Sequence, residues 1–185
     1  MFRGLIKGLA LLVDVVVLDG GIRIGLVLGF DFSLKLGASL RCSGVCLTIV
    51  GVWLRYVELE AWCVSLSLSN FSGVSRFDLI NVEQPLAFNC LLRDRVVSGR
   101  AVSTVKMVRI DKRVRGTRLW FECPSWLVCS LAPCAAAWLN GVSLTLVSVD
   151  NVRFSVCLTP FSLEAVAFNV CCKEFNFEWC QLNSV

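Results

Sequence analysis

The chain contains an internal repeat, and this repeat limits the folds that it can adopt. The block GASLRCSGVCLTIV (residues 37–50) matches CAAAWLNGVSLTLV (residues 134–147). Within the two blocks, Gly44 aligns with Gly141, and each glycine is followed by the pattern Val-x-Leu-Thr. One match of this length can arise by chance, so the rest of the chain has to be compared in the same way.

Two further matches follow in the same order. VSLSLSNFS (64–72) matches FSVCLTPFS (154–162), and INVE (80–83) matches FNFE (175–178). Three ordered matches indicate a duplication with a period of roughly 95 residues, which is too long for a solenoid repeat and suits two copies of a small domain. The predicted domains are residues 1–93 and residues 94–185.

Alternating apolar and polar residues indicate the secondary structure of each copy. The stretches VSLSLS (64–69), VSLTLVSV (142–149) and RFSVCLT (153–159) alternate strictly, which predicts half-buried strands. Helical patterns are short: one covers residues 124–131 with Ser125 as its cap, and the other covers 162–168 with Ser162 as its cap. Many short strands in a domain of roughly 90 residues favour an all-β fold of small closed barrels.

The composition is strongly apolar, which raises the question of a membrane span. The chain is 56% hydrophobic with a mean hydropathy of +0.72. Charged residues interrupt its most apolar stretch, from Leu5 to Phe30, so neither a spanning helix nor a signal peptide fits. We therefore expect a cytoplasmic protein without a membrane partner. The interrupting residues are Lys7, Asp14, Asp19 and Arg23.

The chain has 11 cysteines and no histidine. An odd cysteine count without an export signal argues against a disulfide framework, and the apolar neighbours of most cysteines suggest that they serve as small hydrophobic residues. No C-x-x-C pair is present, so we expect no metal site. The absence of histidine excludes a Ser-His or Cys-His nucleophile pair.

Basic residues gather in one part of the chain. Nine of the 18 lysines and arginines lie between Arg93 and Arg118, against only Asp94 and Asp111. Such a segment could bind nucleic acid or an anionic small molecule. A solvated hairpin with outward-facing basic side chains explains the same alternation without a partner, and we therefore expect no nucleic-acid binding.

Several blocks resemble riboflavin synthase of the alpha-chain type. They are MFRGLIKG (1–8), the two Gly-Val-x-Leu-Thr blocks, LINVE (79–83), and VRFSVCLTPFSLE (152–164). The resemblance covers nearly the whole chain in the right order. It implies two six-stranded Greek-key barrels in tandem and a homo-oligomer, typically a trimer, with each active site between the first barrel of one subunit and the second barrel of its neighbour.

The resemblance also implies a reaction. Members of this family dismutate two molecules of 6,7-dimethyl-8-ribityllumazine by transfer of a four-carbon unit. The products are riboflavin and 5-amino-6-ribitylamino-pyrimidinedione, and no cofactor or metal takes part. A duplicated barrel can then offer one pocket to each of two identical substrates and orient donor against acceptor.

Carried over by position, the resemblance implies which residues serve the reaction. Hydroxyls, backbone amides and an apolar slot suit a neutral heterocycle, and Cys46 could add to an activated ring carbon or merely pack against it. Taken singly, these positions are also explained by packing within strands. The implied catalytic residues are Ser39, Cys46, Arg100 and Thr145. The implied substrate-binding residues are Gly4, Leu5, Ile6, Cys46, Leu47, Thr48, Ser67, Ser72, Gly99, Arg100, Ala101, Cys134, Ser143, Leu144, Thr145, Thr159, Ser162 and Glu164.

The sequence departs from the family at functional positions. Where the family has G-G-H-x-x-S-G-H, this chain reads RDRVVSGR (93–100), so Arg95 and Arg100 replace two histidines. Arginine does not accept a proton at neutral pH, but it can stabilise a lumazine anion. The chain also ends at Val185, before the C-terminal helix that builds the family's trimer. Further replacements are Arg3 for threonine, Ala136 for serine and Cys180 for aspartate.

Two functions from different classes follow. The first is a riboflavin synthase whose chemistry rests on positioning two reactive substrates. The alternative is a non-catalytic protein that holds lumazine or flavin. The lost histidines favour the alternative, whereas polar pocket residues retained in both halves favour the enzyme.

Overall fold

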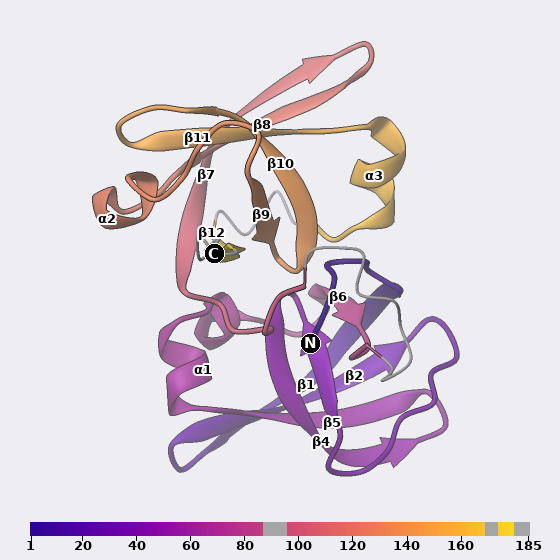
Figure 1. Cartoon of the computed structure of the whole chain (residues 1–185). Helices are drawn as coiled ribbons and strands as arrows, with labels where there is room; N and C mark the ends of the chain where they lie inside the picture. The colour runs from indigo at the N-terminus through magenta and orange to yellow at the C-terminus, as the bar shows by residue number, and fades with distance from the viewer. Residues whose placement is uncertain (87–95, 169–173, 180–185) are drawn as a thin grey trace.

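The computed structural model describes residues 1–86, 96–168 and 174–179 (Figure 1). Two closed antiparallel barrels of six strands each lie one above the other in this view. The first barrel has the strand order β1-β2-β5-β4-β3-β6, and the second has the same cyclic order, β7-β8-β11-β10-β9-β12. The predicted pair of six-stranded barrels is therefore confirmed.

The strands of the two barrels are separated in sequence by a connection whose middle lies outside the described residues. The predicted domain boundary between residues 93 and 94 falls in that part. The first barrel consists of β1 (Gly8–Leu18), β2 (Gly21–Leu28), β3 (Ser39–Cys42), β4 (Val45–Trp53), β5 (Tyr56–Trp62) and β6 (Leu79–Glu83). The second consists of β7 (Ser103–Arg113), β8 (Gly116–Glu122), β9 (Ala136–Leu139), β10 (Val142–Val149), β11 (Arg153–Leu158) and β12 (Glu174–Trp179).

Each barrel is filled by its own apolar side chains. In β5 and β8, every second residue is buried and its neighbours are more exposed, as the period of a strand requires. The first core is mainly aliphatic, with Ile24, Leu26 and Leu59 fully buried. The second contains Phe121, Phe154, Phe175 and Phe177, whose rings contact one another.

The repeated Gly-Val-x-Leu-Thr block forms a tight hairpin in each barrel. Ser43 and Gly44 connect β3 to β4, and Asn140 and Gly141 connect β9 to β10; all four residues have positive φ angles. Such two-residue turns match the twist of antiparallel strands and favour Asn-Gly-like pairs. A Cβ added to Gly44 would lie 2.9 Å from the backbone nitrogen of Gly141, so the two turns meet backbone to backbone between the barrels.

The second repeated block was predicted wrongly. Residues 64–69 do not form a strand: α1 covers Cys63–Ser67, and a short 3-10 helix, η1, covers Asn70–Gly73. The matching stretch lies in a strand, β11, from Phe154 to Leu158, so the two segments are not structural equivalents. In this alternating run, Val64 and Leu68 are four residues apart, so they also lie on one face of a helix. A run this short does not exclude a helix.

Both predicted helices exist, but their starts differ from the prediction. The first, α2 (Ser125–Val128), is preceded by Pro124 at the N-cap, and Ser125 is its first residue. The other, α3 (Pro160–Ala165), begins two residues before the predicted cap Ser162. The Thr159 side chain accepts a hydrogen bond from the Ser162 backbone nitrogen, and Pro160 suits the first helical position because it has no N–H to satisfy.

The basic segment forms the predicted hairpin as far as it is described. Strands β7 and β8 pair in antiparallel register and extend beyond the barrel in Figure 1. Arg109, Lys112 and Arg113 are exposed along β7. Arg93 and Arg95 lie outside the described residues. Within the part of the chain that the structure covers, no helix is long and apolar enough to cross a membrane, and no group of three acidic, cysteine or histidine residues could hold a metal ion.

The interpretation of cysteine as a small core residue holds for only part of the described set. Cys42 and Cys123 are buried, and Cys46 is half-buried. The other four are exposed, and they lie at helices, in a loop and on an outward position of a strand. The exposed cysteines are Cys63, Cys129, Cys134 and Cys157.

The buried thiols predict a loss of stability at alkaline pH. Burial raises the pKa of Cys42 far above its ordinary value and raises that of Cys123 to about 11. In the unfolded chain a thiol ionises near its ordinary pKa of 9.0. Above that pH the folded state retains protons that the unfolded state has lost, so the unfolding free energy falls as pH rises. For Cys42 we expect a contribution of about 1.4 kcal/mol per pH unit.

Denaturant unfolding measured from pH 8 to about pH 10.5 checks this prediction, because it spans the ordinary thiol pKa. Comparison with Cys42→Ala isolates the thiol from lysines and tyrosine that titrate in the same range. The variant should start less stable but lose stability less steeply. Parallel curves for the two proteins would contradict the prediction.

Candidate functional site

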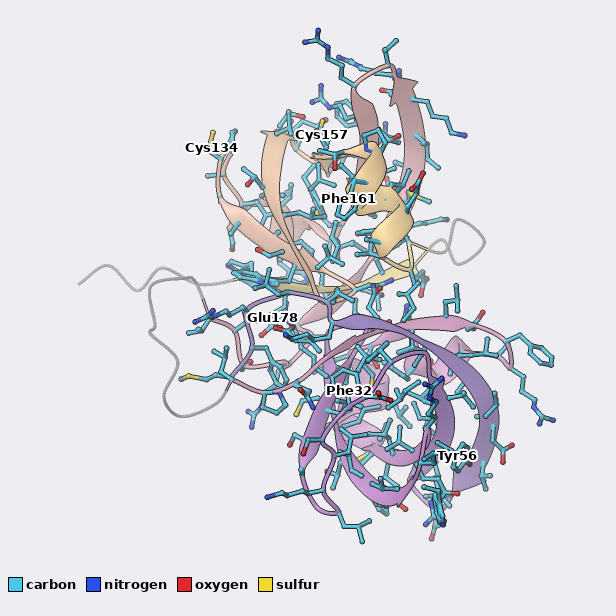
Figure 2. All side chains as sticks on the ribbon, turned by 90° about the vertical axis from the view of Figure 1, so that its right-hand side faces the viewer. Phe32, Tyr56, Cys134, Cys157, Phe161 and Glu178 are labelled. Carbon is cyan, nitrogen blue, oxygen red and sulfur yellow. The ribbon has the colours of Figure 1, made fainter. Side chains whose placement is uncertain are left out.

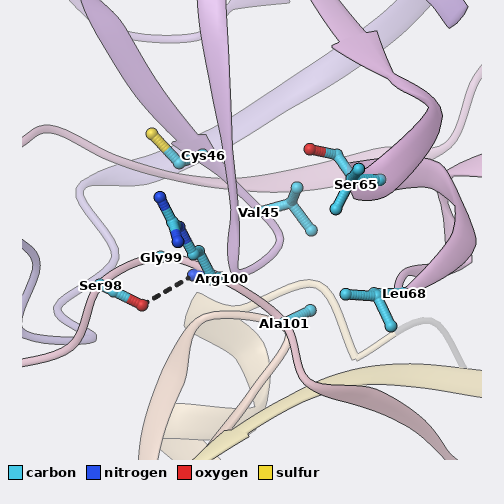
Figure 3. A pocket seen from close by; sticks show the side chains of 9 residues that line it. Val45, Cys46, Ser65, Leu68, Ser98, Gly99, Arg100 and Ala101 are labelled. Carbon is cyan, nitrogen blue, oxygen red and sulfur yellow. Dashed lines mark hydrogen bonds between the residues drawn. The ribbon is translucent and has the colours of Figure 1, made fainter.

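A pocket of about 520 Å³ opens at the end of the first barrel that faces the second (Figure 3). Three parts of the chain line it: the start of β4, the helix α1, and the segment that leads into the second barrel. Its volume lies in the range of small-molecule sites. The lining residues are Val45, Cys46, Val64, Ser65, Leu68, Ser98, Gly99, Arg100 and Ala101.

The residues 97–101, which we call the crossing segment, belong by sequence to the second half but lie against the first barrel. Val97 exchanges two backbone hydrogen bonds of 2.9 Å with Phe2, and the carbonyl of Gly99 accepts one of 2.9 Å from the Cys46 backbone nitrogen. Ala101 packs into the core of the first barrel. The first barrel alone therefore supplies only part of its pocket.

Gly99 is required by the close approach within the crossing segment. Its φ angle is +79°, in the left-handed region that favours glycine. A Cβ at this position would lie 2.8 Å from the Phe2 ring and 3.2 Å from the Cβ of Cys46. The glycine thus lets the backbone approach β4 closely and leaves the space beside Cys46 to the pocket.

A buried carboxylate holds the crossing segment in place. Glu178 of β12 accepts hydrogen bonds from the backbone nitrogens of Ser98 (3.0 Å) and Gly99 (3.1 Å) and from the Ser98 hydroxyl (3.0 Å). Figure 2 shows Glu178 between the two barrels. The Ser98 hydroxyl in turn accepts a 3.3 Å bond from the Arg100 backbone nitrogen. This network fixes the backbone from which the Arg100 side chain extends.

The opposite wall is also tied to the second barrel. The 3-10 helix that follows α1 donates from the Asn70 backbone nitrogen to the Asn176 side-chain oxygen of β12, at 2.7 Å. The Asn176 amide donates in turn to the Ser43 carbonyl at 2.8 Å. Both walls of the pocket are therefore positioned by β12, a strand of the second barrel.

The pocket combines an apolar slot with a few polar groups. Val45, Val64 and Leu68 supply apolar surface, and Ser65 and Ser98 supply hydroxyls. Arg100 carries the single charge among the lining residues that the structure describes, and its side chain extends toward Cys46 in Figure 3. Such a lining can hold a flat heterocycle and attract negative charge that develops on it.

The second barrel has a corresponding arrangement with the N-terminal segment in place of the crossing segment. Glu83 of β6 accepts backbone hydrogen bonds from Arg3 (2.7 Å), Gly4 (2.9 Å) and Leu5 (3.3 Å). The Gly4 carbonyl accepts one of 3.2 Å from Ser143 of β10. Like Ala101 in the other direction, Ile6 packs against the core of the second barrel. Each barrel is therefore covered by a segment that comes from outside its own strands.

The structure distributes the implied residues that lie on or against the first barrel over different places. Cys46, Gly99, Arg100 and Ala101 come together in the pocket. Leu47 points into the barrel core and is 2% exposed. Ser39 lies opposite Thr48 on the next strand and lines a different cavity, of about 540 Å³, with Ala38 and Ile49. Of the remaining two, Ser67 ends α1 and Ser72 lies in η1, and both are exposed.

The implied residues of the second half lie on the second barrel. Ser143 is held against Gly4, and Leu144 packs against the core. The exposed Thr145 follows on the same strand. Cys134 is exposed with a φ angle of 66°, in the loop before β9. The others lie at or within α3: Thr159 at its N-cap, then Ser162 and Glu164.

Five pocket residues were missed by reasoning from the sequence. Val45 immediately precedes Cys46 in the repeated block, and Ser98 precedes Gly99. Their position next to a predicted site residue could have indicated both of them. Val64, Ser65 and Leu68 were hidden because their segment was taken for a strand. Two replaced family positions, Arg95 and Cys180, lie outside the described residues.

Comparison with known proteins places the chain in a family. No family model matches the sequence. The chain is 30% identical over 164 residues to riboflavin synthase of Brucella abortus, covering 85% of this chain and 81% of that protein. The chain belongs to the riboflavin synthase family. Riboflavin synthase of Escherichia coli is also similar, at 27% identity over 162 residues, covering 85% of this chain and 76% of that protein.

The chain is also similar to a relative with another name and to solved structures of the same fold. The blue fluorescence protein of Aliivibrio fischeri is 25% identical over 122 residues, which cover 63% of this chain and 61% of that protein. Two crystal structures of LumP, one complexed with riboflavin and one with 6,7-dimethyl-8-(1'-D-ribityl) lumazine, superpose with TM-scores of 0.87 and 0.86. They cover 98% of this chain and 100% of LumP at 18% and 16% identity, so they show a shared fold.

Proposed function

We propose that the chain is a riboflavin synthase that binds 6,7-dimethyl-8-ribityllumazine in the pocket of the first barrel. The observation that carries the proposal is the convergence of Cys46, the crossing segment and Arg100 on one cavity at the end of the barrel. Membership of the riboflavin synthase family supports the reaction. Two lumazine molecules contain together all the atoms of riboflavin and the pyrimidinedione product, so the protein has to orient two reactants and stabilise charge.

Arg100 is proposed to stabilise the lumazine anion. The anion forms when the methyl group at C7 loses a proton, and a guanidinium that lines the same cavity lowers its energy by charge and hydrogen bonding. Arginine does not take that proton. The acceptor in this proposal is water or the second substrate molecule, because no carboxylate or imidazole occurs among the described lining residues.

The second barrel is proposed to present the other lumazine. Ser143, Thr145 and the start of α3 lie on this barrel. The Gly4 carbonyl accepts a hydrogen bond from this barrel, as the Gly99 carbonyl does from the first. In a homo-oligomer, the first barrel of one subunit would face the second barrel of another and bring donor and acceptor together. The N-terminal segment covers the second barrel in the same way as the crossing segment covers the first, and this similarity supports the pairing.

A binding protein without turnover is the second candidate. It is favoured by the absence of histidine from the whole chain and by the lack of an ordinary proton acceptor among the described lining residues. The blue fluorescence protein and LumP, which share the sequence pattern or the fold, carry names and titles other than riboflavin synthase. Such a protein would hold one ligand in the first pocket and release it unchanged.

Incubation of the purified protein with 6,7-dimethyl-8-ribityllumazine, followed by riboflavin fluorescence, separates the candidates. We expect riboflavin well above a no-protein control and a fall in rate of about a hundredfold in Arg100→Ala, typical of removing one group that stabilises an oxyanion. Arg55→Ala, which removes an exposed arginine in the turn between β4 and β5, is the matched control and should keep the rate. Stoichiometric lumazine binding without riboflavin would support the binding protein instead.

A further inference from the structure

Arg41 is buried between the barrels, and neither the repeat nor the family resemblance drew attention to it. It lies on β3, is 1% exposed, and does not line the pocket. Its guanidinium donates to Glu83 at 3.0 Å and to Glu178 at 2.6 Å. It also donates to the carbonyls of Gly44 (3.2 Å) and Gly141 (3.4 Å). One side chain thus contacts the hairpin turns of both barrels and both buried carboxylates.

The two carboxylates need a counter-charge. Glu83 and Glu178 are 4% and 5% exposed, and a buried ionised carboxylate without a partner is costly. Arg41 contacts one oxygen of each. The other oxygen of each is then free to accept backbone N–H groups: Glu83 from the N-terminal segment and Glu178 from the crossing segment. The planar fork of arginine suits this bridging, which a lysine could not reproduce in full.

A second contact links Arg41 to the crossing segment. Its guanidinium carbon lies 5.4 Å from the centre of the Phe2 ring, within range of a cation–π interaction. Phe2 exchanges its two backbone hydrogen bonds with Val97, at the start of the crossing segment. Arg41 therefore supports this segment at both Val97 and Ser98–Gly99, each time through one intermediate residue.

We infer that Arg41 is a positioning residue that fixes the crossing segment, and with it Arg100, against the ligand pocket of the first barrel. The inference deepens the proposed function, since the pocket is the one proposed to bind lumazine. Without Arg41, Glu83 and Glu178 would both lose the guanidinium that neutralises their charge in a buried place. Glu178 would then turn away or take up a proton, and Ser98 and Gly99 would lose their acceptor.

The test compares Arg41→Met with the wild type in two measurements. Titration with 6,7-dimethyl-8-ribityllumazine, followed by its fluorescence, should give a Kd at least about tenfold higher for the variant, which corresponds to about 1.4 kcal/mol. Amide hydrogen exchange should become faster at Ser98, Gly99 and Cys46, while the amides of β5 stay protected. Arg23→Met is the matched control, because Arg23 pairs with Glu60 at 2.7 Å on the outside of the barrel.

Two more variants separate positioning from a general loss of packing. Arg41→Lys keeps a charge without the fork and should fall between wild type and Arg41→Met. In the double variant Arg41→Met/Glu178→Gln, the side-chain oxygen of glutamine still accepts from Ser98 and Gly99 but carries no charge, so part of the affinity should return. A cavity left by arginine would not be relieved by this second change.

The outcomes decide the inference independently of the proposed function. Unchanged affinity and unchanged exchange in Arg41→Met would overturn it, as would exchange that rises equally throughout the molecule. If Arg41→Met does not fold, the same two readouts apply to Arg41→Lys, and wild-type behaviour of that variant would overturn the inference. If the wild type does not bind lumazine, the proposed function fails, whereas local exchange at Ser98 and Gly99 still decides the role of Arg41.

Discussion

Glu178→Ala is expected to lower the unfolding free energy by about 3–5 kcal/mol, the usual cost of breaking a buried ion pair, and to abolish ligand binding in the first pocket. The carboxylate accepts three hydrogen bonds from Ser98 and Gly99 and pairs with Arg41. Alanine would leave these donors and the guanidinium without this acceptor in a buried place. Urea unfolding followed by tryptophan fluorescence, together with lumazine titration at low temperature, measures both effects.

Glu83→Ala is the matched control, because Glu83 occupies the equivalent position on β6. It pairs with the same arginine at 3.0 Å and holds Gly4 instead of Gly99. We expect a similar loss of stability but a smaller effect on affinity, since the crossing segment keeps its own carboxylate. Equal losses of affinity in the two variants would show that the carboxylates do not act on separate segments.

Gly44→Ala is expected to be destabilising by about 2–4 kcal/mol, because strain and overlap add. Gly44 has a φ angle of +90°, which disfavours any L-residue. In addition, the new Cβ would lie 2.9 Å from the backbone nitrogen of Gly141, where only backbone could yield. The two barrels would have to move apart at their hairpin turns. Thermal and urea unfolding of the variant measure the cost.

Gly20→Ala separates these two contributions. Gly20 has a similar φ angle of +82°, but a Cβ there meets nothing within 4 Å. This variant should therefore show the strain alone, about 1–2 kcal/mol. If Gly44→Ala were no more destabilising than Gly20→Ala, the close approach of the two turns would not be a feature of the folded protein in solution.

The fold was predictable because each repeated block and each turn can be recognised from a few neighbouring residues. Ser43–Gly44 and Asn140–Gly141 carry turn chemistry in neighbouring residues, and β5 and β8 show their period within seven residues. The segment around Ser65 was misjudged because the alternation of Val64, Leu66 and Leu68 fits a strand, whereas only Val64 and Leu68 share a helix face. Its helical state depends on contacts that the local pattern does not contain.

The candidate site was only partly predictable for a different reason. Cys46 and Arg100 were implied by resemblance, but their neighbourhood depends on contacts between residues far apart in sequence. Glu178 was not implied as a site residue, and its partner Arg41 is 137 residues away. The sequence shows that both halves carry an Asn-x-Glu pattern, yet that pattern does not indicate that each glutamate holds a segment that lies against the other barrel.

The crossing of segments between barrels has a consequence for synthesis on the ribosome. The chain emerges N-terminus first, so the six strands of the first barrel, complete at Glu83, are available long before the pocket they carry can form. Residues 97–101 must follow, and then β12 must deliver Glu178 and Asn176 to hold the walls. A ligand can therefore bind and stabilise this site only once synthesis has passed Glu178. A stop codon within β12 would leave a first barrel that could close but no finished pocket.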